Sequence, residues 1–117
     1  MPEQRNHTRF NAPAGALALT CGGMSKVIDI SKGGISLMFQ DNMNRDIPKE
    51  LSLDILSTDY FITAREIPGK LVWEQEVPIS TMPRIVHKKV GVQFGKLSST
   101  QNDQIDNLII NYTTESA

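Results

Sequence analysis

Short runs of β-branched and aliphatic residues alternate with turn-forming Gly, Pro and Asn along most of this 117-residue chain. Such runs are typical of β-strands, because successive side chains of a strand point to opposite faces of a sheet. The clearest case is Leu51-Ser52-Leu53-Asp54-Ile55, in which apolar and polar residues alternate throughout. Because no comparable helical period appears before the last twenty or so residues, the pattern predicts an antiparallel β fold of about six strands.

The expected strands are the segments rich in β-branched or aliphatic residues, and they cover residues 16–21, 26–30, 35–39, 51–55, 61–67, 70–74 and 84–94. Pro68-Gly69 predicts a turn or bulge, so the segments on either side of it form one bent strand or two. Loops are expected from Asp41 to Lys49 and from Val77 to Pro83. Residues 1–15 have no periodicity and are interpreted as an irregular, flexible arm.

The end of the chain changes to a helical period. Apolar residues fall at i, i+3, i+4 and i+7, namely Ile105, Leu108, Ile109 and Tyr112. Ser98 or Ser99 is in position to cap the helix. We therefore predict one domain over residues 1–117, dominated by β structure: an antiparallel β-barrel over 16–96 and one C-terminal α-helix over 98–114 that packs on the sheet or over one barrel mouth.

Composition limits the classes of function. Twelve basic and thirteen acidic residues give a net charge of −1, which argues against a nucleic-acid polymer or a membrane as partner. Aromatic residues are only 6% of the chain, so the core is expected to consist mainly of Leu, Ile, Val and Met. Cys21 is the single cysteine, and no Cys/His pattern indicates a metal. With no secretory or membrane-spanning apolar run, a cytoplasmic location is expected.

Two groups of residues carry chemistry. Arg5 and Arg9 stand four positions apart in the arm, and a guanidinium binds phosphate through two parallel hydrogen bonds or grips the edge of guanine. Asp29, Ser31 and Gly34 form Asp-x-Ser-x-x-Gly at a turn between two expected strands. A carboxylate can accept the hydrogen bonds that guanine donates, the hydroxyl is a rotatable partner, and the glycine allows close backbone approach or a positive φ.

The order Arg-x-x-x-Arg, then Asp-x-Ser-x-x-Gly about twenty residues later, resembles the paired signature of PilZ domains. The likeness covers nearly the whole chain, since 69–73, 90–94 and the terminal helix are similar to later PilZ elements. Composition alone gives the second motif in about 3% of such chains, and the arginine pair within the first ten residues in about 1–2%. The resemblance implies a bacterial, six-stranded barrel that binds cyclic di-GMP through both motifs.

Several other residues could have either a structural role or a role in binding. Trp73 is either the aromatic anchor of the core or, as in some PilZ domains, a surface against which guanine lies. Gly33 either serves only the turn or contributes to the ligand site. His7 is interpreted as a variable position between the arginines. The basic residues of the segment 84–89 are interpreted as a solvated strand face rather than an anion site.

The expected function is that of a non-catalytic receptor, because no nucleophile motif, metal-ligand spacing or phosphate loop is present and no cofactor is implied. Ligand-induced ordering of the arm would carry the signal to a downstream protein partner. The alternative is a ligand-independent PilZ-like adaptor. A single-stranded nucleic-acid binder would need aromatic residues interleaved with basic ones, which the sequence lacks. The sequence does not indicate the downstream process or the oligomeric state. Whether one or two ligand molecules bind depends on the neighbours of Arg5, such as Gln4.

Overall fold

The computed structural model describes residues 7–20, 23–39, 47–79 and 82–115. The elements in this part of the chain are, in order, β1 (Phe10–Asn11), β2 (Leu17–Thr20), β3 (Gly23–Ile30), β4 (Gly34–Phe39), β5 (Glu50–Leu56), β6 (Ile62–Ile79), β7 (Met82–Phe94) and α1 (Ser99–Glu115). The expected strands are thus all present, most of them a few residues longer than the sequence pattern predicts.

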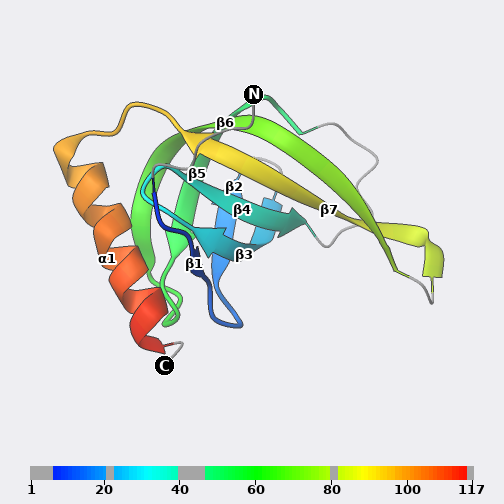
Figure 1. Cartoon of the computed structure of the whole chain (residues 1–117), viewed down its shortest axis with the longest axis horizontal. Helices are drawn as coiled ribbons and strands as arrows, with labels where there is room; N and C mark the ends of the chain where they lie inside the picture. Colours follow the sequence, from blue (N-terminus) through cyan, green and yellow to red (C-terminus); the bar gives the residue numbers. More distant parts are fainter. Residues whose placement is uncertain (1–6, 21–22, 40–46, 80–81, 116–117) are drawn as a thin grey trace.

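The strands close into a barrel. The sheet has the order β1-β3-β2-β5-β6-β7-β4. The last strand, β4, also pairs with β3, and this pairing closes the six antiparallel strands β2 to β7 into a ring (Figure 1). The predicted six-stranded antiparallel barrel with one C-terminal helix is confirmed. The extra strand β1 pairs Phe10 with Ile30 and Asn11 with Asp29. An irregular structure throughout the arm was therefore a wrong prediction at these two residues.

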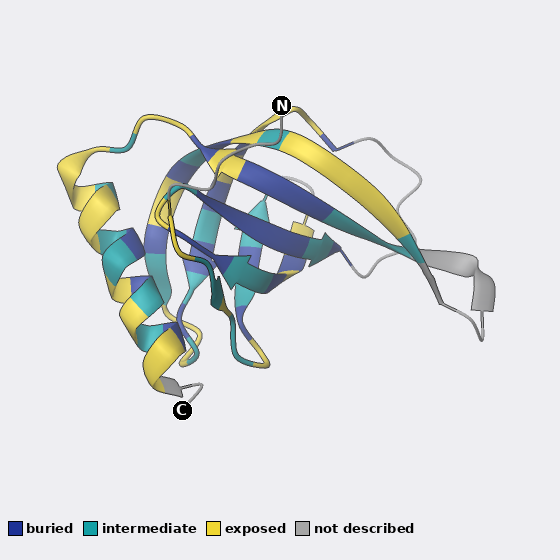
Figure 2. Cartoon of the chain, viewed as in Figure 1, coloured by how far each residue is buried: buried dark blue, intermediate teal, exposed yellow. Residues whose placement is uncertain are grey.

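The inward faces of the strands form one apolar core (Figure 2). Its largest fully buried members are Tyr112, Phe39, Ile30, Ile35, Leu37, Leu53, Ile55, Ile67, Ile105, Leu108, Val27 and Val90. The prediction that Ile, Leu and Val dominate the core is confirmed. Of the methionines whose burial the structure describes, neither joins the core as expected, since Met24 is 59% exposed and Met38 is only half-buried.

Strand β6 is one continuous strand, and its first bulge lies a few residues before the position that the sequence predicts. Pro68 and Gly69 pair in regular register with Ser52 and Leu51 of β5, so a turn or bulge at these two residues was a wrong prediction. The register instead shifts opposite the segment 64–67, where Glu66 has a φ of 52°. A residue in the left-handed region leaves its backbone groups out of the ladder, so other partners must satisfy them.

The loop expected from Val77 to Pro83 was also a wrong prediction. β6 continues to Ile79 and β7 begins at Met82, and the two strands remain paired to their ends. They extend as a two-stranded ribbon beyond the barrel (Figure 1). Within the ribbon Glu76 lies opposite Lys88, and such opposite charges favour cross-strand pairing.

Helix α1 packs along β6 and β1 at one side of the barrel (Figure 1). Ser98 Oγ accepts a hydrogen bond from the Gln101 N–H at 3.1 Å, and Gln101 Oε1 accepts one from the Ser98 N–H at 3.0 Å. This capping box confirms Ser98 as the cap. The predicted stripe is confirmed too: Ile105, Leu108 and Tyr112 are buried and Ile109 is partly buried. No helix in the described ranges is long and apolar enough to span a membrane.

Side-chain amides of α1 complete the hydrogen bonds of the β6 bulge. The amide nitrogen of Gln101 donates to the Glu66 carbonyl at 2.9 Å, and Gln104 Oε1 accepts from the Arg65 N–H at 3.1 Å. Asp54 Oδ1 accepts from the Glu66 N–H at 2.8 Å. The contacts of Gln101 and Gln104 fix the first turns of α1 against β6.

Tyr112 joins the other end of the helix to the core. Its ring is fully buried, and its hydroxyl donates to the Leu56 carbonyl at 2.8 Å. Burial raises the pKa of Tyr112 above its usual 10.0, because the phenolate would lose its hydration. The folded state therefore holds this proton more tightly than the unfolded chain does. Its contribution to stability is complete below about pH 10 and is lost as the pH rises beyond that value.

We expect Tyr112→Phe to lower the free energy of unfolding at neutral pH by about 1–2 kcal/mol, because the Leu56 carbonyl loses its donor. The variant should also lose part of the wild-type destabilisation between about pH 10 and pH 12. Urea unfolding at several pH values measures both effects. Tyr60→Phe is the matched control, because Tyr60 is 62% exposed. An identical alkaline slope in wild type and Tyr112→Phe contradicts the role given to Tyr112.

Candidate functional site

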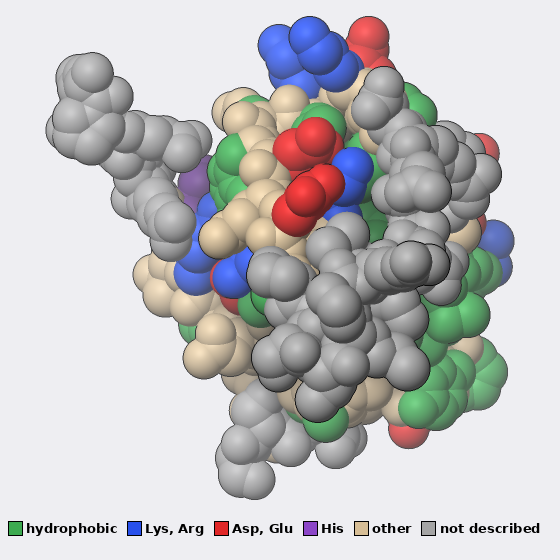
Figure 3. Space-filling view, turned by 90° about the vertical axis from the view of Figure 1, so that its right-hand side faces the viewer, with side chains coloured by type: hydrophobic (Ala, Val, Ile, Leu, Met, Phe, Trp, Pro, Cys, Tyr) green, Lys and Arg blue, Asp and Glu red, His purple; other side chains and the backbone are tan. Residues whose placement is uncertain are grey.

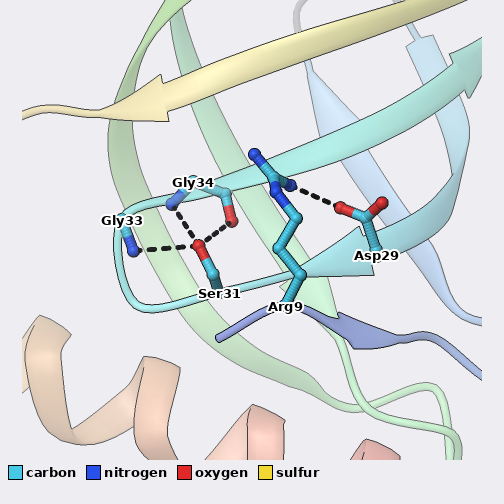
Figure 4. A network of polar contacts seen from close by, with 5 residues as sticks. All are labelled: Arg9, Asp29, Ser31, Gly33 and Gly34. Atoms are coloured by element: carbon cyan, nitrogen blue, oxygen red, sulfur yellow. Dashed lines mark hydrogen bonds and ion pairs between the residues drawn. The ribbon is translucent and has the colours of Figure 1, made fainter. Parts of the chain in front are cut away.

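The turn between β3 and β4 is built around the hydroxyl of Ser31. Ser31 Oγ accepts hydrogen bonds from the N–H groups of Gly33 and Gly34, each at 3.2 Å, and lies 3.4 Å from the Gly34 carbonyl oxygen (Figure 4). The residue is only 4% exposed. Its side chain thus serves mainly to hold the turn in shape, as Ser often does in tight turns.

Gly34 permits the close approach of β4 to β7. A Cβ atom at this position would lie 2.5 Å from the carbonyl oxygen of Val92, a separation that no real side chain tolerates. The Phe94 N–H also donates to the Gly33 carbonyl at 2.9 Å. Gly34 does not have the positive φ that the sequence left open. The glycine is required because the turn lies against the backbone of β7.

Arg9 reaches the turn from the arm and is fixed by Asp29 of β3. Its terminal nitrogen Nη1 lies 2.6 Å from Asp29 Oδ1, and the two side chains are 28% and 22% exposed. The other terminal nitrogen is directed away from the carboxylate (Figure 4). A charge-assisted hydrogen bond of this kind orients the guanidinium while leaving donors free for another anion.

Trp73 lies on the outside of the barrel because of a second bulge in β6. The register shifts between Leu71 and Trp73, so Trp73 comes to face Gly91 on the outer side of β7. A Cβ atom at position 91 would lie 2.1 Å from the indole Nε1, which places the ring directly on the glycine. The side chain is 39% exposed. Of the two readings of Trp73, the core anchor is therefore wrong.

These elements enclose a cleft of about 390 Å³. Its walls come from the arm, the β3–β4 turn, the outer side of β6 and β7, and the start of α1, and they consist of His7, Arg9, Ser31, Lys32, Gly33, Gly34, Val72, Trp73, Gly91, Val92, Gln93, Phe94, Gly95, Leu97 and Asn102. The volume is within the range of small-molecule sites. Among these described residues the cleft has two permanent cations, Arg9 and Lys32, and no acidic side chain.

Most of the residues selected from the sequence meet at this cleft. Arg9, Ser31, Gly34, Gly33 and Trp73 all line it. Asp29 does not, and instead contacts the cleft through its ion pair with Arg9. Arg5 lies outside the described residues.

Four further polar residues of the cleft were not selected from the sequence: His7, Lys32, Gln93 and Asn102. His7 was interpreted as a variable position, yet its ring lies over Gly33, where a Cβ would come within 2.8 Å of it. Lys32 stands inside the Asp-x-Ser-x-x-Gly motif, and this placement is the one signal that could have drawn attention to it. Gln93 and Asn102 join the site only through folding.

The positive charge of the cleft is local. On the face of the molecule seen in Figure 3, acidic and basic side chains are interspersed, with no broad surface of one sign among the residues drawn in colour. No group of three or more His, Cys, Asp or Glu side chains in the described ranges is placed to hold a metal ion. The arrangement suits a compact anion with aromatic or planar parts rather than a charged polymer.

Comparison with known families assigns the chain to a group with this architecture. The sequence model of the PilZ domain matches residues 3–111. The chain belongs to the PilZ domain family. The match includes the arm, the barrel and most of α1, and it confirms the resemblance carried by the two motifs. No curated protein sequence gave a significant match.

Several solved structures share the fold. The PilZ domain of YcgR from Escherichia coli, solved with c-di-GMP, superposes with a TM-score of 0.71 at 14% identity, over 97% of this chain and 95% of that one. The K. pneumonia MrkH–c-di-GMP complex gives a TM-score of 0.64 at 15% identity, over 98% of this chain and 55% of that one. The Bacillus subtilis inhibitor of motility, MotI/DgrA, gives 0.61 at 15%, over 98% and 52%. This PilZ domain thus spans about half the length of the last two.

The contact of Gly34 with β7 leads to a prediction about stability. Gly34→Ala should lower the free energy of unfolding by about 1–3 kcal/mol, because the added methyl group meets the backbone of Val92. Gly33→Ala is the matched control, since its methyl group meets only the ring of His7, an exposed side chain that can rotate away. That variant should change stability by no more than about 0.5 kcal/mol. Urea unfolding measures both, and equal losses would refute the explanation.

Proposed function

We propose that this PilZ domain is a non-catalytic receptor for cyclic di-GMP, and that the ligand binds in the cleft between the arm, the β3–β4 turn and β7. The observation that carries the proposal is the lining of the cleft. Two cations, an exposed indole and a glycine-rich backbone meet there, with no acidic side chain among the described lining residues, in a chain whose net charge is −1. Family membership and the c-di-GMP complexes of structurally similar PilZ proteins support the same ligand.

The chemistry of the ligand matches these groups. Cyclic di-GMP carries two phosphates and two guanines, so it needs cations, planar surfaces and hydrogen-bond partners within a small volume. We assign Arg9 to a phosphate or to the O6 and N7 edge of a guanine, both of which take the two parallel donors of a guanidinium. Arg5, four positions earlier in the sequence, is assigned to the same ligand. The indole of Trp73 offers a face for stacking of a guanine.

The residues of the turn act in two ways. Ser31 and Gly34 shape the turn and bring its backbone to the ligand, while Gly33 leaves room under His7. Asp29 orients Arg9 in the free domain, and its carboxylate can accept hydrogen bonds from guanine when the ligand engages Arg9. We place the receptor in the cytoplasm, in keeping with a single unpaired cysteine in the sequence.

Isothermal titration calorimetry tests the ligand and the site together. Cyclic di-GMP should bind, whereas GTP and a short single-stranded oligonucleotide should not. Arg9→Ala and Asp29→Ala should each weaken binding by at least about fivefold, the effect of about 1 kcal/mol lost from a charged hydrogen bond. Arg65→Ala and Asp59→Ala are matched controls, since both residues are exposed and neither lines the cleft. The stoichiometry also distinguishes one bound molecule from two.

Other outcomes of the titration identify the alternatives. Absence of binding to all three ligands points to the ligand-independent adaptor, and preferential binding of the oligonucleotide points to a nucleic-acid protein. Wild-type affinity in both Arg9→Ala and Asp29→Ala overturns the site. Trp73 is the single tryptophan of the chain, so a ligand that stacks on it should change the intrinsic fluorescence. That signal gives a second measure of occupancy.

The signal is proposed to pass to a partner protein through ordering of the arm. Each residue that becomes ordered costs about 1–2 kcal/mol, so several charged contacts are needed to offset the ordering of a segment. Backbone ¹⁵N relaxation of residues before Arg9, with and without cyclic di-GMP, measures this. We expect the bound arm to reach the rigidity of the barrel strands. Relaxation that does not change at saturating ligand disproves the proposed signal.

A further inference from the structure

Lys32 lies between an acidic side chain of α1 and the cleft. It stands inside the Asp-x-Ser-x-x-Gly turn and lines the cleft. Its ammonium nitrogen Nζ lies 3.3 Å from Asp106 Oδ1 on α1, and the side chains of Lys32 and Asp106 are 63% and 42% exposed. Asp106 does not line the cleft. The lysine can therefore face an anion in the cleft only by sharing or leaving its present partner.

The ion pair of Lys32 with Asp106 is weak enough to be exchanged. Exposed pairs of this type change an equilibrium constant by at most about fivefold, because water and salt screen the charges. A phosphate in the cleft carries a full negative charge, and its hydrogen bonds to an ammonium are about twice as strong as neutral ones. Lysine also has a flexible stem and three donors, so it can turn from one acceptor to the other without moving the backbone.

Helix α1 presents a second residue on the same side. Asn102 precedes Asp106 by four positions, so both side chains project from one face of the helix. Asn102 itself lines the cleft. The helix is thus in contact with the cleft at Asn102 and with the turn at Asp106. A change at Lys32 affects the contact between the turn and α1 directly.

We infer that Lys32 is a further ligand-binding residue and that Asp106 is an intramolecular competitor for it. This inference rests on the proposed binding of cyclic di-GMP. In the free domain the carboxylate of Asp106 holds the ammonium. A ligand phosphate takes it over, which lowers the net affinity by the strength of the lost ion pair and releases the turn from α1. Occupancy of the cleft therefore weakens the contact of the helix with the turn, and the two are linked in free energy.

Four variants and their affinities for cyclic di-GMP test the inference by calorimetry and Trp73 fluorescence. Lys32→Gln should weaken binding by about three- to tenfold, in the range of a charged hydrogen bond. Asp106→Asn should instead tighten binding by about two- to fivefold, the strength of the pair that it removes. In the double variant, Asp106→Asn should have no effect, because Lys32 is no longer present to be released. The increase in affinity caused by Asp106→Asn should be smaller at high salt, because salt screens the ion pair that this variant removes.

Two control variants distinguish the exchange of partners by Lys32 from a general effect of changing the charge of the domain. Lys96→Gln and Asp103→Asn alter the same charges at exposed positions near the cleft and on α1, respectively, and neither residue lines the cleft. Both should bind like wild type. Wild-type affinity in Lys32→Gln, or unchanged or weaker binding in Asp106→Asn, overturns the inference while leaving the receptor intact. Failure of the wild-type domain to bind cyclic di-GMP overturns the proposed function as well.

Discussion

The closure of the barrel by β4 is the constraint on which both the fold and the cleft depend. β4 pairs with β3 on one side and with β7 on the other, so the turn that precedes it must lie directly against the end of β7. The backbones can approach this closely because Gly34 adds no side chain facing Val92. On the outer side of β7, Gly91 has no side chain and so leaves the space that the ring of Trp73 occupies. Two missing side chains thus shape the floor of the cleft and position its aromatic wall.

The electrostatic design of the site follows from where the carboxylates stand. Each permanent cation of the described cleft is held by an acidic side chain that lies outside its lining, Arg9 by Asp29 and Lys32 by Asp106. The two pairs differ in environment. The first is part-buried and short, so it orients its arginine, whereas the second is exposed and more easily exchanged. Arg9 is thereby held in one orientation, whereas Lys32 can exchange its partner. The two cations face the cleft although the whole chain has a net charge of only −1.

Local patterns in the sequence predicted the elements that depend on local periodicity. The alternation around Leu53 and the stripe of Ile105 and Tyr112 each bury one face, and the structure confirms them because burial is what produces the periodicity. The motif residues Arg9 and Gly34 could be selected for the same site only because the family signature links them. The contact of Lys32 with α1 could not be predicted, because it joins residues 74 positions apart.

The errors have a common physical origin in long-range pairing. The sequence left two roles open for Trp73, core anchor or ligand surface. One extra residue in the bulge turns it outward, and the glycine beneath it stands on another strand. The segment from Val77 to Pro83 was expected to be a loop. In a two-stranded ribbon each strand has a free edge, where a proline nitrogen need not give up a ladder hydrogen bond. The β6 bulge likewise depends on Asp54 and Gln101, which lie far from Glu66 in the sequence.

The ribbon of β6 and β7 begins at the cleft, since Trp73 and Gly91 stand at its base. From Trp73 to Ile79 the strand rises by about 20 Å at roughly 3.3 Å per residue. The two strands stay paired along this length, with a register shift between Pro78 and Ile79. One continuous strand therefore connects the aromatic wall of the cleft with a part of the surface that projects beyond the barrel (Figure 1).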